Sequence, residues 1–450
     1  MRAEANEKPI NAIVAAVQLP NVSDIEFESS LAELRDLAKT LGFEIVATFT
    51  QKRSSFDSTA YLGAGKREEI REFVDMEPAP GAFEKPLHAA ADPAAGKIDA
   101  IFVDHEISPS QARNLEKETG CEVMDRTMVI LEIFHRHATS RAARAQVEIA
   151  RLGYMAPRLR EAAKLAGPQG RQRSGTGGRG AGESHTELDR RKIRDQIAAL
   201  QQEIIAMDAE RKTQRARRQD RQGGANVALV GYTNAGKSTL MRALTGSDVL
   251  VENKLFATLD TTVRALQPES RPRVLVSDTV GFIKNLPHGL VASFKSTLEE
   301  ALDASLLLHV IDASDPGFER QLAVTDKVLA EIGAQGVPRL RIFNKIDHVG
   351  DAAAQAEREA ALRAAYRDCI VMSARRVDDV ALLRESIVGF FRQDQVEAEL
   401  FLPWSAQQQR AAIFASCDVL DERADAEGAF LRVRGERETV KGLCEQFAAR

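Results

Sequence analysis

The sequence predicts an α/β protein whose sheets are largely parallel. Short apolar runs of strand length recur along the chain, and stretches with helical spacing lie between them. Strands that alternate with helices in this way are typical of parallel sheets covered by helices. A change of composition near residues 136 and 222 divides the chain further. At 450 residues, about three domains are expected rather than one.

The first part of the chain, residues 1–135, is predicted to be an α/β domain. The apolar runs AIVAAVQ, FEIVATF and KIDAIFVD have the length of buried strands. Helical spacing covers residues 29–40, 67–74 and 110–119. Residues 76–96 are rich in Pro, Ala and Gly, so a surface loop or insertion is expected there.

Residues 136–222 are predicted to form a basic helical hairpin. One helix has an apolar seam at alternating steps of four and three, formed by Ile193, Ile197, Leu200, Ile204 and Met207. An earlier helix near residues 140–154 repeats this spacing with Ala143, Val147, Ala150 and Tyr154. Pro157 is expected to disturb the end of that helix.

The predicted tip of the hairpin, residues 167–182, contains seven glycines and three arginines. Residues 136–221 hold twenty Lys and Arg against ten Asp and Glu, although the whole chain has a net charge of −5. Positive charge concentrated in one segment indicates contact with a polyanion. A solvated coiled coil or a dimer seam would have the same helical pattern, so these residues alone leave both interpretations open.

Two further domains are predicted after the hairpin. In residues 225–392 the strands NVALVGY, RVLVSD, ASLLLHVID and RLRIFNKID alternate with helices, which indicates a second, mostly parallel sheet. Residues 395–450 contain AELFLPW, a helix, CDVLDE, AFLRVRG and a last helix, the order of a small α+β domain. Trp404 is expected to be a core residue of this domain.

Composition argues against several classes of protein. Cys121, Cys369, Cys417 and Cys444 lie far apart and form no Cys-x-x-Cys pair, so neither a disulfide framework nor a zinc site is expected. No apolar stretch is long enough to span a membrane, and the first residues lead into no signal-peptide core. We therefore expect a cytoplasmic protein without a membrane span, and a monomer.

The segment GYTNAGKS fits the pattern G-x-x-x-x-G-K-[ST] of a phosphate-binding loop, between the strand NVALV and the helix STLMRAL. Its glycines let backbone N–H groups wrap a phosphate at the start of a helix. Lys237 can neutralise the β and γ oxygens, and the Ser238 hydroxyl can ligate magnesium. The predicted nucleotide-binding residues here are Gly231, Tyr232, Thr233, Asn234, Ala235, Gly236, Lys237 and Ser238.

A second motif ends the strand VLVS and consists of Asp278, Thr279, Val280 and Gly281. An acidic residue at the end of a strand can hold magnesium through water, and the Gly281 N–H can sense a γ-phosphate. The motif follows the phosphate loop at about the interval that this fold requires. All four residues are expected to bind nucleotide.

A third and a fourth motif predict selection of guanine. Asn344, Lys345, Ile346 and Asp347 end the strand RLRIF, and Ser373 and Ala374 follow the apolar CIVM. The Asp347 carboxylate can accept hydrogen bonds from the N1–H and the amino group of guanine, a donor pair that adenine lacks. Lys345 packs along the base, and a backbone N–H of the Ser-Ala pair can point at the guanine O6. The four ordered motifs therefore predict a GTPase.

The loop LFATLDTT, between the first two motifs, is expected to close on the nucleotide. Such a loop supplies one hydroxyl to the magnesium shell when the γ-phosphate is present. Thr258, Thr261 and Thr262 compete for this role.

The residue that follows Gly281 is unusual for hydrolysis. Many GTPases have a glutamine there that orients the attacking water, whereas this chain has Phe282, which cannot hydrogen-bond to water. Hydrolysis without a partner is therefore expected to be slow. We hypothesise that Asn234 helps to bind a potassium ion that acts like an arginine finger; a loop-stabilising asparagine is the alternative.

The sequence resembles the HflX family of ribosome-associated GTPases, in the Obg-HflX group, over nearly its whole length. In the nucleotide-binding part the resemblance rests on GYTNAGKSTL, LFATLD and DTVGFIKNLPHGLVASFKSTLEEA. Before it, the resemblance rests on YLGAGKREEI, SPSQARNLEKETG, VMDRTMVILEIFHRHA and GRGAGESHTELDRRKIRDQI. Three segments depart from the family pattern: Thr261 stands where a proline is usual, residues 180–184 differ from the usual tip, and residues 76–96 form a longer stretch than usual.

The resemblance implies a GTPase that uses Mg²⁺, binds the large (50S) ribosomal subunit, and splits or rescues stalled ribosomes with its hairpin tip near the peptidyl-transferase region. It implies that Phe256, Ala257, Thr258, Leu259 and Asp260 contact nucleotide. It favours Thr258, with Ser238, as the magnesium ligands, and the catalytic residues are then Lys237, Thr258 and Gly281. Two alternatives are a checkpoint GTPase in ribosome assembly and a hairpin that only dimerises.

Overall fold

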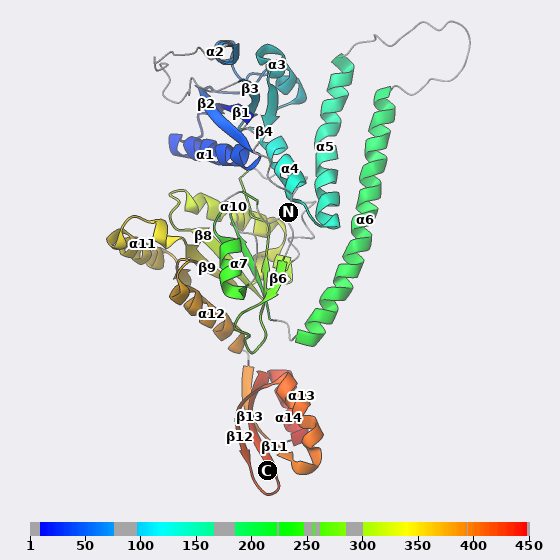
Figure 1. Cartoon of the computed structure of the whole chain (residues 1–450), viewed down its shortest axis with the longest axis vertical. Coiled ribbons are helices and arrows are strands. Elements are labelled where there is room, and N and C mark those ends of the chain that lie inside the picture. Colours follow the sequence, from blue (N-terminus) through cyan, green and yellow to red (C-terminus); the bar gives the residue numbers. More distant parts are fainter. Residues whose placement is uncertain are drawn as a thin grey trace, which may run out of the picture.

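The computed structural model describes residues 10–75, 97–165, 185–222, 225–246, 255–256, 262–284, 300–393 and 395–447. The strands in these ranges form three sheets, which succeed one another along the long axis of the molecule (Figure 1). The predicted α/β fold class with largely parallel sheets is confirmed.

The N-terminal sheet consists of parallel strands in the order β2-β1-β3-β4. Its elements are β1 (Ile10–Gln18), α1 (Asp24–Thr40), β2 (Phe43–Lys52), α2 (Ala64–Asp75), β3 (Ile98–Val103), α3 (Pro109–Thr119), β4 (Glu122–Asp125) and α4 (Arg126–His137). Neighbouring residues of β1 face opposite sides: Val14 packs in the core with α1 and α4, and Ile13 in the core with α2 and α3. Because helices cover both faces, β1 is apolar without interruption from Ala12 to Val17.

The sequence did not predict β4 and α4, and it placed the start of α1 too late. The α4 segment contains MVILEIF, which is buried on nearly every side. Its apolar residues therefore do not show the sequence spacing by which a helix is distinguished from a strand. Helix α1 begins after Ser23, whose hydroxyl accepts the Glu26 N–H as an N-cap. The loop expected at residues 76–96 lies outside the described residues.

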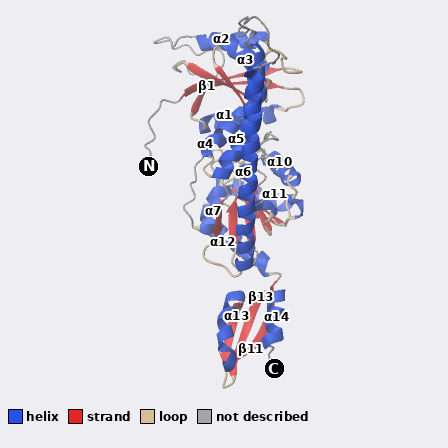
Figure 2. Cartoon of the chain, turned by 90° about the vertical axis from the view of Figure 1, so that its right-hand side faces the viewer, coloured by secondary structure: helices blue, strands red, loops and turns tan. Residues whose placement is uncertain are grey.

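The predicted hairpin helices are α5 (Arg141–Leu165) and α6 (His185–Gln222), which lie side by side (Figures 1 and 2). The apolar seam of α6 is half-buried. The matching face of α5 belongs instead to the N-terminal core, which contains Ala143 and Val147. The expected tip at residues 167–182 lies outside the described residues.

The prediction that Pro157 disturbs α5 is wrong in one respect, because the helix continues to Leu165. Pro157 has no N–H, so the carbonyl of Gly153 loses its helical hydrogen bond. Both residues are exposed. Water can therefore hydrogen-bond to the freed carbonyl, and the missing N–H costs the helix little.

The central sheet has the order β10-β9-β8-β5-β7-β6, in which only β6 is antiparallel to its neighbour. Its elements are β5 (Asn226–Gly231), α7 (Lys237–Thr245), β6 (Thr262–Ala265), β7 (Leu275–Asp278), β8 (Leu306–Asp312), α10 (Phe318–Glu331), β9 (Arg339–Asn344), α11 (Ala352–Ala365), β10 (Cys369–Val371) and α12 (Val377–Arg392). The parallel strands end at one edge of the sheet, which is where ligands bind in such folds.

The C-terminal sheet is antiparallel, with the order β11-β13-β12. Its elements are β11 (Gln395–Pro403), the short helix η3 (Trp404–Gln409), α13 (Arg410–Ser416), β12 (Asp418–Ala424), β13 (Gly428–Glu436) and α14 (Arg437–Phe447). Trp404 was expected in the core and is not there. It starts η3, outside the sheet, and is 44% exposed.

The N-terminal and central parts share one apolar core. It includes Leu31 of α1, Phe134 of α4, and Phe256 and Phe282 from the loops at the edge of the central sheet. The rings of Phe134 and Phe256 meet edge to face with centroids 4.6 Å apart. The N-terminal part therefore packs against the edge at which the parallel strands end. Among the described helices, none combines the length and the apolarity that crossing a bilayer requires.

Candidate nucleotide site

The phosphate loop joins β5 to α7, in the context that its motif predicts. Gly231 has φ +147°, and a Cβ there would lie 2.2 Å from the Val310 carbonyl oxygen. Gly236 has φ +96°, and a Cβ there would lie 2.3 Å from the Asn344 amide nitrogen. Side chains at either position would collide with fixed neighbours, so both glycines are required by the close approach of other strands.

Lys237 is buried at the start of α7. Its Nζ donates to the carbonyl oxygens of Gly231 at 3.0 Å and Tyr232 at 2.7 Å. Burial lowers the pKa of Lys237 to about 8, although the nearby Asp278 carboxylate opposes this shift. The ammonium is therefore poorly compensated, and an anion beside it would favour its charged form.

Two polar groups accompany Lys237. The Ser238 hydroxyl donates to Asp278 Oδ2 at 2.8 Å, and Asp278 is fully buried at the end of β7. In the described part of the chain, the buried Thr233 hydroxyl has no hydrogen-bond partner. Both hydroxyls and the carboxylate offer oxygen ligands in one small region.

Gly281 lies against the phosphate loop. A Cβ at Gly281 would be 2.9 Å from Thr233 Cα and 3.0 Å from Lys237 Nζ, so only glycine fits between them. The next residue, Phe282, is 1% exposed in the shared core. The residue at the usual glutamine position therefore points into the protein interior.

The third motif contacts the phosphate loop directly. The Asn344 side chain donates to the Ala235 carbonyl at 3.0 Å and accepts the Ala374 N–H at 2.9 Å, so it joins three of the four motifs. Lys345 has φ +63°, and its Nζ pairs with Asp312 Oδ2 at 2.9 Å. Because Ala374 already donates to Asn344, a contact with the guanine O6 stays a prediction.

Asp347 lies in a polar setting that keeps it charged. Burial raises its pKa, but hydrogen bonds from Ser373 and its own backbone, with charges on His348 and Arg375, lower it overall. Arg375 Nη1 and His348 Nε2 lie 3.9 and 3.6 Å from its carboxylate. A charged acceptor for a base is therefore present at the expected place.

The site has contributors that the motifs did not reveal. Asp379, in the first turn of α12, accepts the Ser373 N–H at 2.8 Å. From α1, Glu33 accepts a hydrogen bond from the Tyr232 hydroxyl at 2.6 Å. Nothing in the local sequence marks Glu33, because its partner Tyr232 lies 199 positions away along the chain. Asp379 lies only six residues after Ser373, but it belongs to none of the four motifs.

The switch loop is described only in part. Ala257, Thr258, Leu259 and Asp260 lie outside the described residues, so the role of Thr258 stays a prediction. Phe256, with φ +58°, directs its side chain into the shared core rather than towards the phosphate loop. Thr262 begins β6, opposite Asp278.

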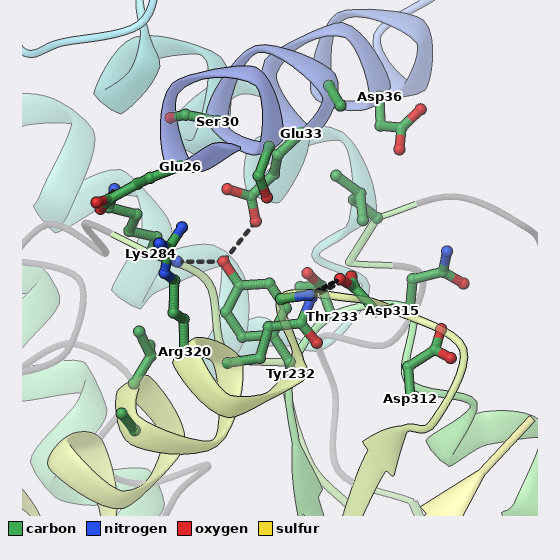
Figure 3. A pocket seen from close by; sticks show the side chains of 18 residues that line it. Glu26, Ser30, Glu33, Asp36, Tyr232, Thr233, Lys284, Asp312, Asp315 and Arg320 are labelled. Atoms are coloured by element: carbon green, nitrogen blue, oxygen red, sulfur yellow. Dashed lines mark hydrogen bonds and ion pairs between the residues drawn. The ribbon is translucent and has the colours of Figure 1, made fainter. Parts of the chain in front are cut away.

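A cavity of about 420 Å³ lies beside the phosphate loop and opens between α1 and α10 (Figure 3). Its lining includes Thr233 and Asn234, together with Glu33, Asp36 and Asp315. Asn234 is exposed and has φ +58°. In the described part of the chain, no group of three or more His, Cys, Asp or Glu side chains is arranged to hold a metal.

Comparison with known proteins covers most of the chain. Family models described as GTP-binding GTPase N-terminal, GTP-binding GTPase Middle Region and 50S ribosome-binding GTPase match residues 28–135, 137–218 and 226–345. A GTPase HflX of Gluconacetobacter diazotrophicus is 51% identical over 98% of both chains. One from Caldanaerobacter subterraneus subsp. tengcongensis is 38% identical over 92% of this chain and 89% of its own.

A solved GTP-binding protein of Sulfolobus solfataricus in complex with GDP is 23% identical, covers 84% of this chain and 99% of its own, and has a TM-score of 0.42. The family matches agree with the four motifs and with the phosphate loop at the edge of the central sheet. The protein binds and hydrolyses GTP, and the chain belongs to the HflX family of GTPases.

Proposed function

We propose that this GTPase binds the large ribosomal subunit in the cytoplasm and splits or rescues stalled ribosomes. The description of the model that matches residues 226–345, a 50S ribosome-binding GTPase, supports this partner. The observation that carries the proposal is the paired helices α5 and α6. With 38 residues, α6 is about 57 Å long at 1.5 Å per residue, enough to place its N-terminal end, which follows the Gly- and Arg-rich segment, far from its C-terminal end beside β5.

The hairpin tip is proposed to contact ribosomal RNA. Its sequence offers arginines that can bind phosphates or stack on unpaired bases. Tyr154 and Arg158 of α5 both hydrogen-bond to the buried Asp125 carboxylate, so the second half of α5 is anchored on the N-terminal sheet. A helix pair that is fixed in this way can transmit a movement of the nucleotide-binding part to RNA.

For the nucleotide, we propose that Lys237 neutralises the terminal phosphates, that the Gly281 N–H senses the γ-phosphate and that Asp347 selects guanine. Ser238 and Thr258 would ligate Mg²⁺, with Asp278 acting through water. The fit is good on the described side, because a buried carboxylate and a hydroxyl are the oxygen donors that Mg²⁺ prefers. When bound, Mg²⁺ neutralises charge on the phosphate oxygens.

Completion of the hydrolytic site is proposed to need help from outside the second motif. Phe282 is buried, so its side chain positions no water. The exposed Asn234 amide, in the phosphate loop, would help to bind K⁺. Turnover is expected to be higher in potassium than in sodium chloride, and equal rates would rule out this role.

Ribosome binding is tested by pelleting with purified large subunits, with GDP or a non-hydrolysable GTP analogue. The full-length chain should co-pellet with the analogue, and replacing Arg171, Arg173 and Arg179 with Ser should abolish this. A matched control replaces Lys97, Lys327 and Arg423, which are exposed and lie outside the hairpin. Unchanged binding of the arginine variant would contradict the tip contact and favour a dimerising hairpin.

Splitting is tested by sedimentation of intact ribosomes. GTP-dependent loss of intact ribosomes is expected. Co-migration with immature large subunits, without splitting, would instead support the checkpoint role in assembly.

A further inference from the structure

Tyr232, the second residue of the phosphate loop, turns its side chain towards α1 (Figure 3). Its hydroxyl donates to Glu33 Oε1 at 2.6 Å. The same hydroxyl accepts the backbone N–H of Lys284 at 2.8 Å. One side chain thus joins the phosphate loop, the segment after the second motif and the N-terminal part.

The segment from Phe282 to Lys284 is tied to the phosphate loop by further hydrogen bonds. Phe282 N–H donates to the Gly231 carbonyl at 3.1 Å, and its carbonyl accepts the Thr233 N–H at 2.7 Å. Lys284 Nζ pairs with Glu26 of α1 at 2.7 Å. Gly281 directly precedes this segment, so these contacts fix where its backbone lies.

Tyr232 is itself held from the side of α1. Glu33 forms an ion pair with the buried Arg126, which also pairs with Asp104 Oδ1 at 2.9 Å. Burial alone would lower the pKa of Arg126, but the Glu33 and Asp104 carboxylates raise it overall, so Arg126 stays charged. Burial, followed by the charge on Glu33, raises the pKa of Tyr232, so its hydroxyl keeps the proton it donates.

We propose that Tyr232 is a positioning residue that sets the place of the Gly281 N–H relative to the phosphate loop, and thereby favours binding of a triphosphate over a diphosphate. The inference rests on the proposed role of Gly281 and is independent of the ribosome. The alternative is that Tyr232 only fills space, since its ring belongs to the shared core. Removing the hydroxyl alone separates these two roles.

The test compares Tyr232→Phe with the unmodified full-length chain. Loss of one buried hydroxyl with two hydrogen bonds should weaken binding of a non-hydrolysable GTP analogue about three- to tenfold. The affinity for GDP, which has no γ-phosphate, should stay within about twofold. Affinities are measured with fluorescent nucleotides, and thermal unfolding confirms that the variant is folded.

Tyr366→Phe is the matched control. The Tyr366 ring packs against Phe318 and Phe343 in the same part of the protein, in a separate apolar cluster whose described members include no residue of α1. Its loss of a hydroxyl should change neither affinity. The positioning role is wrong if Tyr232→Phe binds the analogue as tightly as the unmodified chain does. It is also wrong if the variant loses affinity for the analogue and for GDP by the same factor.

Gly281→Ala separates the proposed role of Gly281 from that of Tyr232. If this variant binds the GTP analogue normally, the role of Gly281 is wrong and the inference fails with it. If Gly281→Ala weakens binding of the analogue but not of GDP, and Tyr232→Phe changes neither affinity, Gly281 acts as proposed but Tyr232 does not position it. Glu33→Gln should also weaken binding of the analogue. Its effect on the affinity should not add to that of Tyr232→Phe.

Discussion

Burial of Lys237 gives nucleotide binding a pH dependence. Burial of the ammonium away from water lowers the pKa of Lys237 to about 8 in the free protein. A bound triphosphate favours the ammonium form, so the pKa is higher in the complex. The affinity for GTP is therefore constant well below pH 8 and falls as the pH rises above 8, because binding must then take up a proton.

Calorimetry checks this proton uptake at the level of one side chain. At pH 8, the apparent binding enthalpy should differ between two buffers of different ionisation enthalpy, since Lys237 is then partly deprotonated. Well below that pH the two buffers should give the same enthalpy. Identical enthalpies under both conditions would show that Lys237 is fully protonated in the free protein.

Asp347 is expected to determine the choice of base. Asp347→Asn replaces an acceptor by a donor, so binding of GTP should weaken by about 100-fold or more. Xanthosine triphosphate, which has a carbonyl where guanine has its amino group, should bind the variant better than GTP does. Asp351→Asn is the control, because Asp351 caps α11 and asparagine caps equally well. Retention of GTP by Asp347→Asn would contradict the assignment.

At the level of elements, Asp125 joins β4, α4 and α5. Its carboxylate accepts the Ile107 N–H at 3.2 Å, the Met128 N–H at 2.9 Å, and hydrogen bonds from Tyr154 and Arg158. The four donors come from the loop before α3, from α4 and from α5, and the acceptor is 1% exposed. Removing it leaves buried donors unpaired, among them a charged one.

Asp125→Ala should therefore lower the free energy of unfolding by about 2–4 kcal/mol. Urea denaturation measures this change. Asp99→Ala, on the exposed side of β3, should change it by less than about 0.5 kcal/mol. Equal effects of the two variants would mean that the contacts of Asp125 do not anchor α5.

The sequence anticipated these elements unevenly. Buried strands such as β1 and β5 were predictable because their apolar runs are bounded by polar residues and turns, and the four motifs placed most nucleotide-binding candidates at strand ends. The contact of Glu33 with Tyr232 joins residues 199 positions apart, and no periodicity encodes such a pair. Trp404, the only tryptophan, was expected in the core of the last domain, whereas it begins η3 and is 44% exposed.

For the whole molecule, the shared core makes the N-terminal and central parts unfold together. The cluster that contains β1 and α4 also contains Phe256 and Phe282, whereas the C-terminal sheet has a core of its own. GDP at 100 times its dissociation constant stabilises the folded protein by about 2.7 kcal/mol. That stabilisation should therefore reach the N-terminal sheet, which does not touch the nucleotide.

Hydrogen exchange tests this coupling in the unmodified protein. With GDP, the slowest amides of β1 should exchange about 100-fold more slowly, and those of β13 should not change. The C-terminal sheet thus serves as an internal control. No change in β1 would show that the N-terminal part opens without the central part.

The shared core also affects how the chain is made. Phe134 leaves the ribosome before its partners Phe256 and Phe282 have been synthesised. At 5–20 residues per second, the apolar side of α4 waits roughly 7–30 s for them. During translation this helix is therefore a target for chaperones. A ribosome that pauses before codon 256 would carry an incomplete, aggregation-prone chain.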